Sequence, residues 1–243
     1  MLLFAVLNLW ISVLVADPTF LWPLDDKSYS AEVVLSPFVR VDTSQCGRTF
    51  GNPPIGSVNS VIEFDGNSYV DVDLLNGYTP TNDYSFSGRF MPTVNSAALF
   101  HYKTNDATQQ FKEMMLYING GKLFMTRTIS GPTVEVSTQI TTTLTLNTWH
   151  SVTFGIDRSN GKSKVYLNKN KEIDEDFDDN IDFETPGVLR IGGTFDQSQP
   201  NFKGRIACVA FWDDEKEPNT DTSHNWCNTK IYNSKYYIRG RCC

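Results

Sequence analysis

The chain is poor in the groups that most enzymes use at their active sites. It has three histidines among 243 residues, and they lie in unrelated segments, at His101, His150 and His224. It also lacks G-x-S-x-G, H-E-x-x-H and a glycine-rich phosphate loop, the motifs that position a nucleophile, a catalytic zinc ion or a nucleotide. A lone histidine without a paired carboxylate or thiol is not a general base. The sequence therefore favours a protein without enzymatic activity.

Positive charge, C-x-x-C pairs and N-glycosylation sequons are also scarce or missing. The net charge is −7, from 21 Lys and Arg against 28 Asp and Glu. Binding to nucleic acid needs a basic face that neutralises phosphates, so we expect no nucleic-acid partner. Without C-x-x-C, zinc and thioredoxin-type chemistry are disfavoured. Without N-x-S/T, N-linked glycans are not expected.

A long apolar run occurs only at the beginning of the chain. Residues Met1 to Ala16 carry no charge, and Asp17-Pro18 follows at once. A bilayer span needs about 20 apolar residues, so this run is too short to cross comfortably. It predicts a signal peptide over residues 1–16, with a retained membrane anchor as the alternative. We therefore expect a secreted, extracellular protein with no membrane span after signal removal.

Helical periodicity is absent, and short alternating segments take its place. In the stretch 147–168, Val152, Phe154 and Ile156 alternate with polar residues, which predicts a half-buried strand. Asn160-Gly161 then predicts a tight turn into a second strand, because both residues tolerate positive φ. Further strands are predicted at 60–64, 69–72, 84–90, 98–102, 114–118, 122–126, 133–139, 187–191 and 204–212. This spacing predicts an all-β fold, a two-sheet antiparallel jelly-roll sandwich, as one domain over residues 17–214.

The five cysteines indicate oxidation in the export pathway. They are Cys46, Cys208, Cys227, Cys242 and Cys243, and an odd number cannot pair completely within one chain. Cys242 and Cys243 end the basic tail predicted over residues 215–243, where few contacts constrain them. We expect one of them to form an intermolecular disulfide and a disulfide-linked homo-oligomer. The alternative is a monomer with one capped cysteine.

The order of several short motifs resembles a known family. These motifs are FLWPLD, IEFDGNSYVDV, YSFSGRFMPT, LYINGGKLFM, the Trp149-His150 hairpin, TPGVLRIGGTF and NFKGRIACVAFWDD. Together they resemble the concanavalin A-like jelly roll of the laminin G and pentraxin group. The resemblance implies that Trp149 packs at the end of a sheet and that His150 points to the rim, with packing as the favoured role of both. It also implies a disulfide between Cys208 and Cys227.

The same superfamily contains glucanases, which carry E-x-D-x-x-E on one strand. Retaining hydrolysis needs two carboxyl groups about 5–5.5 Å apart. The nearest match here begins at Glu172, and Phe177 stands where the last acid belongs. A divergent glycoside hydrolase is therefore the weakest of the readings.

The resemblance to pentraxins implies a calcium site at the rim of the sandwich. Asp65 and Asn67 resemble an early ligand pair, and Asp196 and Gln197 stand for part of a later ligand loop. The alternative is that Asp65-Gly66-Asn67 is an ordinary turn built from favoured turn residues.

A second candidate for calcium is the acidic segment 172–184, which we expect to be a loop between strands. Its residues Asp174, Asp176, Asp178 and Asp182 resemble the start of an EF-hand loop. Asp179 occupies the obligatory glycine position and Thr185 the place of the bidentate Glu, so it is not an EF-hand. The alternative is a solvated, mutually repelling loop.

These observations predict a secreted, non-enzymatic binding module for a glycan or an extracellular matrix protein, with Ca²⁺ as its candidate cofactor. The expected ligand surface is a rim formed by residues 65–68, 102–105 and 196–202. The main alternative is a structural matrix component whose acidic loop contacts calcium or mineral.

Overall fold

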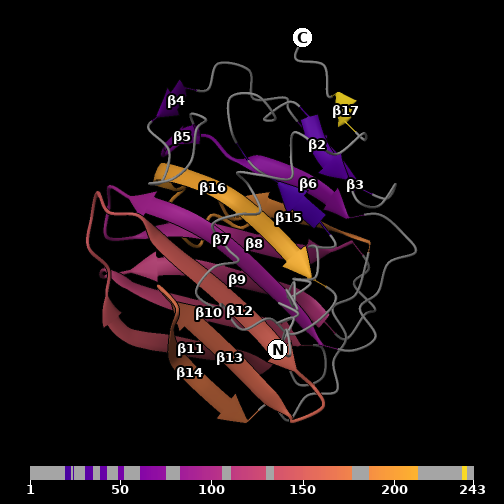
Figure 1. Ribbon diagram of the computed structural model, residues 1–243, viewed down its shortest axis with the longest axis vertical. Helices are drawn as coiled ribbons and strands as arrows, with labels where there is room; N and C mark the ends of the chain where they lie inside the picture. Colours follow the sequence, from indigo (N-terminus) through magenta and orange to yellow (C-terminus); the bar gives the residue numbers. More distant parts are fainter. Residues whose placement is uncertain are drawn as a thin grey trace, which may run out of the picture.

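The computed structural model describes residues 20–22, 24, 31–34, 39–42, 49–51, 61–74, 83–105, 111–129, 134–176, 186–212 and 237–239. Over these residues the chain forms 17 strands and no helix. The strands build two antiparallel sheets that lie face to face, with β12, β13, β14 and β16 in front of β8, β9 and β10 in Figure 1. No helix within the described ranges is long and apolar enough to cross a membrane. The predicted all-β sandwich is confirmed.

Sheet A has ten strands among the described residues. Its main path runs in the order β14 (Asn170–Asp176), β13 (Lys162–Leu167), β12 (His150–Asp157), β7 (Tyr84–Pro92), β16 (Lys203–Trp212), β1 (Phe20–Trp22), β2 (Ala31–Val34) and β17 (Tyr237–Arg239). Beside this path, β5 (Val61–Asp65) pairs with β16, and β4 (Thr49–Gly51) pairs with β5.

Sheet B has seven strands in the described part of the chain. Their order is β11 (Val134–Thr143), β10 (Lys122–Ile129), β9 (Phe111–Asn119), β8 (Ala97–Thr104), β15 (Gly187–Ile191), β6 (Val70–Leu74) and β3 (Val39–Asp42). Every strand segment predicted from alternation corresponds to a strand of sheet A or sheet B, within a few residues at each end.

The core lies between the inward faces of the two sheets. On β12 the predicted inward residues Val152, Phe154 and Ile156 are almost fully buried. Phe154 stands opposite Phe86 of β7, and Tyr84 packs edge-to-face against both of these rings. Because side chains alternate across a strand, the period of two in the sequence decides which residues enter this layer.

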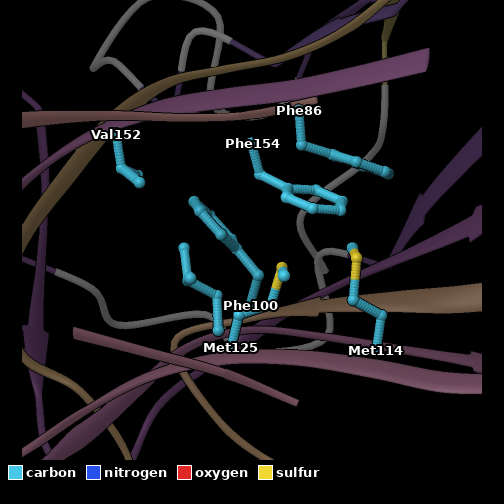
Figure 2. A pocket seen from close by; sticks show the side chains of 7 residues that line it. Phe86, Phe100, Met114, Met125, Val152 and Phe154 are labelled. Atoms are coloured by element: carbon cyan, nitrogen blue, oxygen red, sulfur yellow. The ribbon is translucent and has the colours of Figure 1, made fainter. Parts of the chain in front are cut away.

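A small cavity remains in the middle of the core. Figure 2 shows Phe86, Val152 and Phe154 reaching into it from one side and Phe100, Met114 and Met125 from the other. The first three belong to sheet A and the last three to sheet B. The volume of the cavity is about 10 Å³, which is room for one water molecule at most. The cavity is therefore a packing defect and not a ligand site.

The expected loop over residues 172–184 is partly wrong. Residues Glu172 to Asp176 belong to β14, which pairs with β13 along its whole length. The backbone pairing places Asp174 opposite Lys164 and Asp176 opposite Lys162, so an acidic strand is stabilised by lysines across the ladder. β14 ends the strand order of sheet A, and charged side chains on such an edge also oppose pairing with other chains. Asp178 and Asp182 lie outside the described residues.

The end of the domain differs from the predicted boundary, and most of the cysteines fall outside the described residues. β17, within the predicted tail, pairs with β2 and so belongs to sheet A. Cys208 sits in a bulge of β16 with φ of 54° and is disulfide-bonded. The other four cysteines, Cys46, Cys227, Cys242 and Cys243, lie outside the described residues, as do residues 1–16. The pairing with Cys227, the intermolecular disulfide and the signal peptide stay predictions.

The turn of the predicted hairpin is held by one buried carboxylate. Asp157 ends β12, and its side chain accepts hydrogen bonds from Ser159 Oγ at 2.8 Å, Asn160 N at 3.1 Å and Asn160 Nδ2 at 2.9 Å. Lys164 Nζ lies 3.1 Å from its Oδ2. Burial raises the pKa of Asp157, but these hydrogen bonds outweigh it and hold the pKa well below the ordinary value.

Gly88 of β7 offers a test of the core packing. A Cβ added at Gly88 would lie 2.7 Å from Phe100 Cζ, inside the opposing sheet's side-chain layer. We expect Gly88→Ala to lower the free energy of unfolding by about 1–3 kcal/mol, measured by denaturant titration. Gly120→Asn is the control, because Gly120 has φ of 58° with open space around it and asparagine tolerates that conformation. Equal stability of wild type and Gly88→Ala would contradict this description of the core.

Asp157→Asn tests the carboxylate at the hairpin turn. We expect a loss of about 1.5–3 kcal/mol at pH 7, because the charged acceptor of Lys164 and of the turn donors is removed. The folded pKa is depressed, so this stabilisation is present above the unfolded pKa of about 3.9 and is lost as pH falls below it. The gap in unfolding free energy between wild type and variant should therefore shrink from about pH 4 toward pH 2. A gap that stays constant over that range would show that the charge is not responsible.

Candidate functional site

The outer face of sheet B carries a continuous row of side chains across five strands. Strand pairing places Thr126 of β10, Met115 of β9, His101 of β8, Arg190 of β15 and Asp71 of β6 directly opposite one another in succession. Each of these residues alternates with a core residue along its own strand, so the alternation that buries the core also places this row on the opposite side of the sheet. His101 and Thr126 are nevertheless buried, and the other three residues are half-buried. The row brings together residues that are far apart in the sequence.

Arg190 is the charged centre of this row. Its Nε and Nη2 donate to the two carboxylate oxygens of Asp71, both at 2.8 Å, and its Nη1 donates to Thr194 O at 3.2 Å. The guanidinium also contacts two rings, with its central carbon 3.7 Å from the Tyr69 centroid and 4.3 Å from that of Phe195. Burial lowers the pKa of Arg190, but Asp71 outweighs burial and the pKa is raised. The side chain is therefore a cation whose charge is already balanced.

The loop after β15 folds back over the outer face. Gly192, with φ of 83°, begins the turn, and an added Cβ would lie 2.7 Å from the Phe64 ring. Phe195 N then donates to His101 Nδ1 at 3.1 Å, and the two rings lie 5.0 Å apart in an edge-to-face arrangement. The loop returns along β8, where Ala98 N donates to Pro200 O. We refer to residues 194–200 as the β15–β16 loop.

Two aromatic rings stack beside this loop. Tyr117 of β9 and Phe124 of β10 are opposite each other in the ladder, with centroids 5.3 Å apart and planes 15° apart. Met115 lies next to Tyr117 on the same face, and Ser198 Oγ of the loop is 3.8 Å from its Sδ. Phe124 and Met115 are half-buried, whereas Tyr117 is 9% exposed between Phe124 and the strand β8. We call Met115, Tyr117 and Phe124 the aromatic platform.

The predicted calcium ligands Asp65 and Asn67 form a turn. Asp65 Oδ1 accepts hydrogen bonds from Asn67 N at 2.8 Å, Ser68 N at 3.0 Å and Ser68 Oγ at 3.1 Å. The hydrogen bond from the Asn67 amide is the main cause that lowers the pKa of Asp65. One carboxylate oxygen is thus already saturated by the turn, as the alternative reading predicted.

Asp196 and Gln197 are exposed on the β15–β16 loop. Burial raises the pKa of Asp196, but the Ser198 amide, which donates to its Oδ1 at 3.0 Å, helps to lower it overall. Gln197 has φ of 57°. Residues 65–68 and 196–202, two segments of the expected rim, are in contact, because Asn201 Nδ2 donates to Asn67 O at 3.3 Å.

Acidic side chains do not cluster around the predicted calcium ligands within the described residues. The described residues contain no group of three or more His, Cys, Asp or Glu side chains that could share a metal ion. Calcium also binds carbonyl and amide oxygens, so calcium binding at these residues stays a prediction. In β14, Glu172 accepts a hydrogen bond from Thr142 Oγ1 and Asp174 is paired with Lys171, so these acids are also engaged.

The third part of the expected rim, residues 102–105, lies at the wrong end of sheet B. Asn105 N donates to Pro186 O at the beginning of β15, whereas the β15–β16 loop follows the end of that strand. Tyr102 is fully buried in the core. The error has a simple cause, since a strand places its two ends at opposite edges of the sandwich.

His150 has the predicted packing role. Its Nε2 donates to Thr145 O at 2.9 Å, and its Nδ1 accepts from Asn168 Nδ2 at 3.1 Å. Its ring packs 5.6 Å from that of Phe90, and the residue is 6% exposed, so it does not point to an open rim.

Sequence reasoning missed the aromatic platform and Arg190. The stretch LYINGGKLFM contained a signal, because Tyr117 and Phe124 are placed symmetrically about the turn Asn119–Lys122 and must therefore pair across the hairpin. Nothing local in the sequence indicates that Arg190 meets Asp71, which is 119 residues away.

The comparisons with known proteins match this architecture. Residues 64–220 match a laminin G-like family described as the concanavalin A-like lectin/glucanases superfamily. The chain belongs to this superfamily. No curated protein sequence matches the chain.

Solved structures show the same fold at low sequence identity. Domain 4 of AbnA, a GH43 extracellular arabinanase from Geobacillus stearothermophilus, in complex with arabinotriose, is 14% identical, with a TM-score of 0.61 over 87% of this chain and 98% of that one. The binding domain of botulinum neurotoxin serotype D is 13% identical, with a TM-score of 0.58 over 82% of this chain and 48% of its own. The binding domain of Paraclostridial Mosquitocidal Protein 1 is 10% identical, with a TM-score of 0.58 over 88% and 52%. This chain spans about half the length of the two toxin domains.

Proposed function

We propose that the protein is a secreted, non-enzymatic module that binds a glycan on the outer face of sheet B. The observation that carries the proposal is the stacked pair Tyr117 and Phe124 on that face, bordered by the exposed residues of the β15–β16 loop. An extracellular location follows from the predicted signal peptide over residues 1–16.

The platform has the features that a sugar ring requires. Phe124 is half-buried, with Tyr117 stacked on it from β9 and the exposed residue Gln139 directly opposite it on β11, so part of its ring remains accessible to a ligand. A sugar presents apolar C–H groups on its ring faces, and a fixed aromatic ring binds such a surface at a low entropic cost. Polar groups at the edge then select hydroxyl positions. Gln139 on one side and Gln197 on the other supply amide donors and acceptors for that purpose.

The geometry supports binding over hydrolysis of the same ligand. In the row of residues on the outer face of sheet B, the carboxylate belongs to Asp71, and Arg190 donates to both of its oxygens. The nearest sequence match to a glucanase motif lies in β14, where Glu172 and Glu175 accept hydrogen bonds from Thr142 and Thr138 of the neighbouring sheet edge. A hydrolase needs a carboxyl pair free to act on the glycosidic oxygen and on the anomeric carbon.

The choice of the first probe follows from the comparison with AbnA. Its domain 4 has been solved with arabinotriose, so the same architecture presents a neutral oligosaccharide in that protein. We therefore propose arabinotriose as the first ligand to test, followed by an array of neutral and acidic glycans.

Phe124→Ala tests the platform. We expect it to weaken binding of the retained array glycan, or of arabinotriose, by about tenfold or more, because central aromatic contacts contribute most of the affinity in such sites. Phe124→Leu keeps most of the apolar volume but loses the flat face, so it should weaken binding nearly as much. Isothermal titration gives both affinities.

Lys162→Ala, on strand β13 of sheet A, is the control and should bind as the wild type does. Circular dichroism of each variant must show an intact fold. Undiminished binding by a folded Phe124→Ala would place the ligand elsewhere and reject the proposal.

A chelator separates the platform from the calcium prediction. Ring stacking and amide hydrogen bonds need no metal ion, so we expect affinity in EDTA to equal that in millimolar Ca²⁺. Loss of binding in EDTA, restored by Ca²⁺ and abolished in Asp196→Ala, would show instead that the predicted ligands Asp65, Asn67, Asp196 and Gln197 hold an ion that the glycan requires.

A further inference from the structure

We infer that Arg190 is a positioning residue, which fixes the β15–β16 loop beside the aromatic platform and so sets the affinity for the ligand without contacting it. The inference deepens the proposed function and rests on it for the ligand. Its structural part, that Arg190 holds the loop, stands on the contacts of Arg190 alone.

Arg190 joins the loop to the sheet because its guanidinium group contacts both of them. On the sheet side, both carboxylate oxygens of Asp71 and the Tyr69 ring fix the guanidinium. On the loop side, Thr194 O accepts one of its N–H groups and the Phe195 ring covers its plane. The side chains of Arg190 and Asp71 are 15% and 19% exposed, so solvent competes little for these bonds.

The glycine before the loop makes room for this arrangement. A Cβ at Gly193 would lie 3.3 Å from Arg190 Cδ, 3.3 Å from Tyr69 Cβ and 2.8 Å from Asn201 Oδ1. A side chain at position 193 would therefore crowd the aliphatic part of Arg190 and Tyr69, so glycine at this position leaves room for both. The local sequence Arg-Ile-Gly-Gly thus provides both Arg190, which holds the loop, and the space beside Arg190 that a side chain at position 193 would fill.

The rest of the loop is held by fewer and more exposed contacts. Asp196, Gln197 and Ser198 are exposed. Ser198 N donates to Asp196 Oδ1 in a local turn, and Ser198 Oγ lies 3.8 Å from Met115 Sδ. A local turn fixes the shape of a loop but not its place on the sheet. The place is fixed by Arg190, by the bond from Phe195 N to His101 Nδ1 and, at the end of the loop, by the bond from Ala98 N to Pro200 O.

Arg190 acts through the loop and not on the ligand. Its charge is balanced by Asp71, and rings on both sides leave no open face for a sugar. Lysine cannot reproduce the arrangement, because an ammonium group is not planar and cannot form the two-pronged bond to Asp71 while lying between two rings. The inference therefore predicts that Arg190→Lys fails to restore the loop although it keeps the positive charge.

Hydrogen exchange measures the structural part directly. In Arg190→Met we expect the amide of Phe195, which bonds to His101 Nδ1 on β8, to exchange at least tenfold faster than in the wild type, with Arg190→Lys closer to Arg190→Met than to the wild type. The amide of Phe154 in the core should be unchanged. Arg205→Met is the matched control, because Arg205 also pairs with a carboxylate, Glu63, but on sheet A. Unchanged exchange at Phe195 in Arg190→Met would overturn the inference, and so would an equal acceleration at Phe154.

Binding measures the functional part. We expect Arg190→Met to weaken binding of arabinotriose, or of the glycan retained from the array, by five- to tenfold, while Arg205→Met binds as the wild type does. A folded Arg190→Met with a released loop and unchanged affinity would overturn the positioning role. A wild type that binds no glycan would reject the proposed function, while the exchange experiment still decides whether Arg190 holds the loop.

Discussion

The structure depends on burying one face of each sheet against the other. Residues such as Phe86, Phe100 and Phe154 fill the layer between the sheets, and the cavity left among them holds no more than a water molecule. Packing this dense makes even one methyl group costly where Gly88 faces the Phe100 ring. Because side chains alternate along each strand, the same constraint determines which residues remain on the outer faces.

The outer face of sheet B is where these remaining side chains form a defined surface. Neighbouring strands place Met115, His101, Arg190 and Asp71 in one row, and the hairpin of β9 and β10 places Tyr117 beside Phe124. The β15–β16 loop is then fixed over this row by Arg190 and His101. A rigid sandwich thus positions an aromatic surface and a polar loop next to each other, as a binding module for a sugar requires.

The alternation of apolar and polar residues along the chain was sufficient to predict the fold. It did not predict the strand β14, where charged residues replace the apolar ones. The dense negative charge of residues 172–184 predicts a solvated loop, whereas lysines on β13 compensate the acids of β14 across the ladder. The platform could have been predicted from the symmetry of Tyr117 and Phe124 about their turn. The pairing of Arg190 with Asp71 could not, because strand order in a sheet is a long-range property. The expected rim failed for the same reason, since Asn105 and the β15–β16 loop lie at opposite ends of β15.

The most direct test of the binding face is a map of the ligand on the protein in solution. Arabinotriose titrated into ¹⁵N-labelled protein should shift the amide resonances of Tyr117, Phe124 and Ser198 in a saturable way and leave those of β13 and β14 unchanged. Saturable shifts confined to sheet A, to the acidic strand β14 or to the turn at Asp65 would contradict the account and place the ligand on another surface.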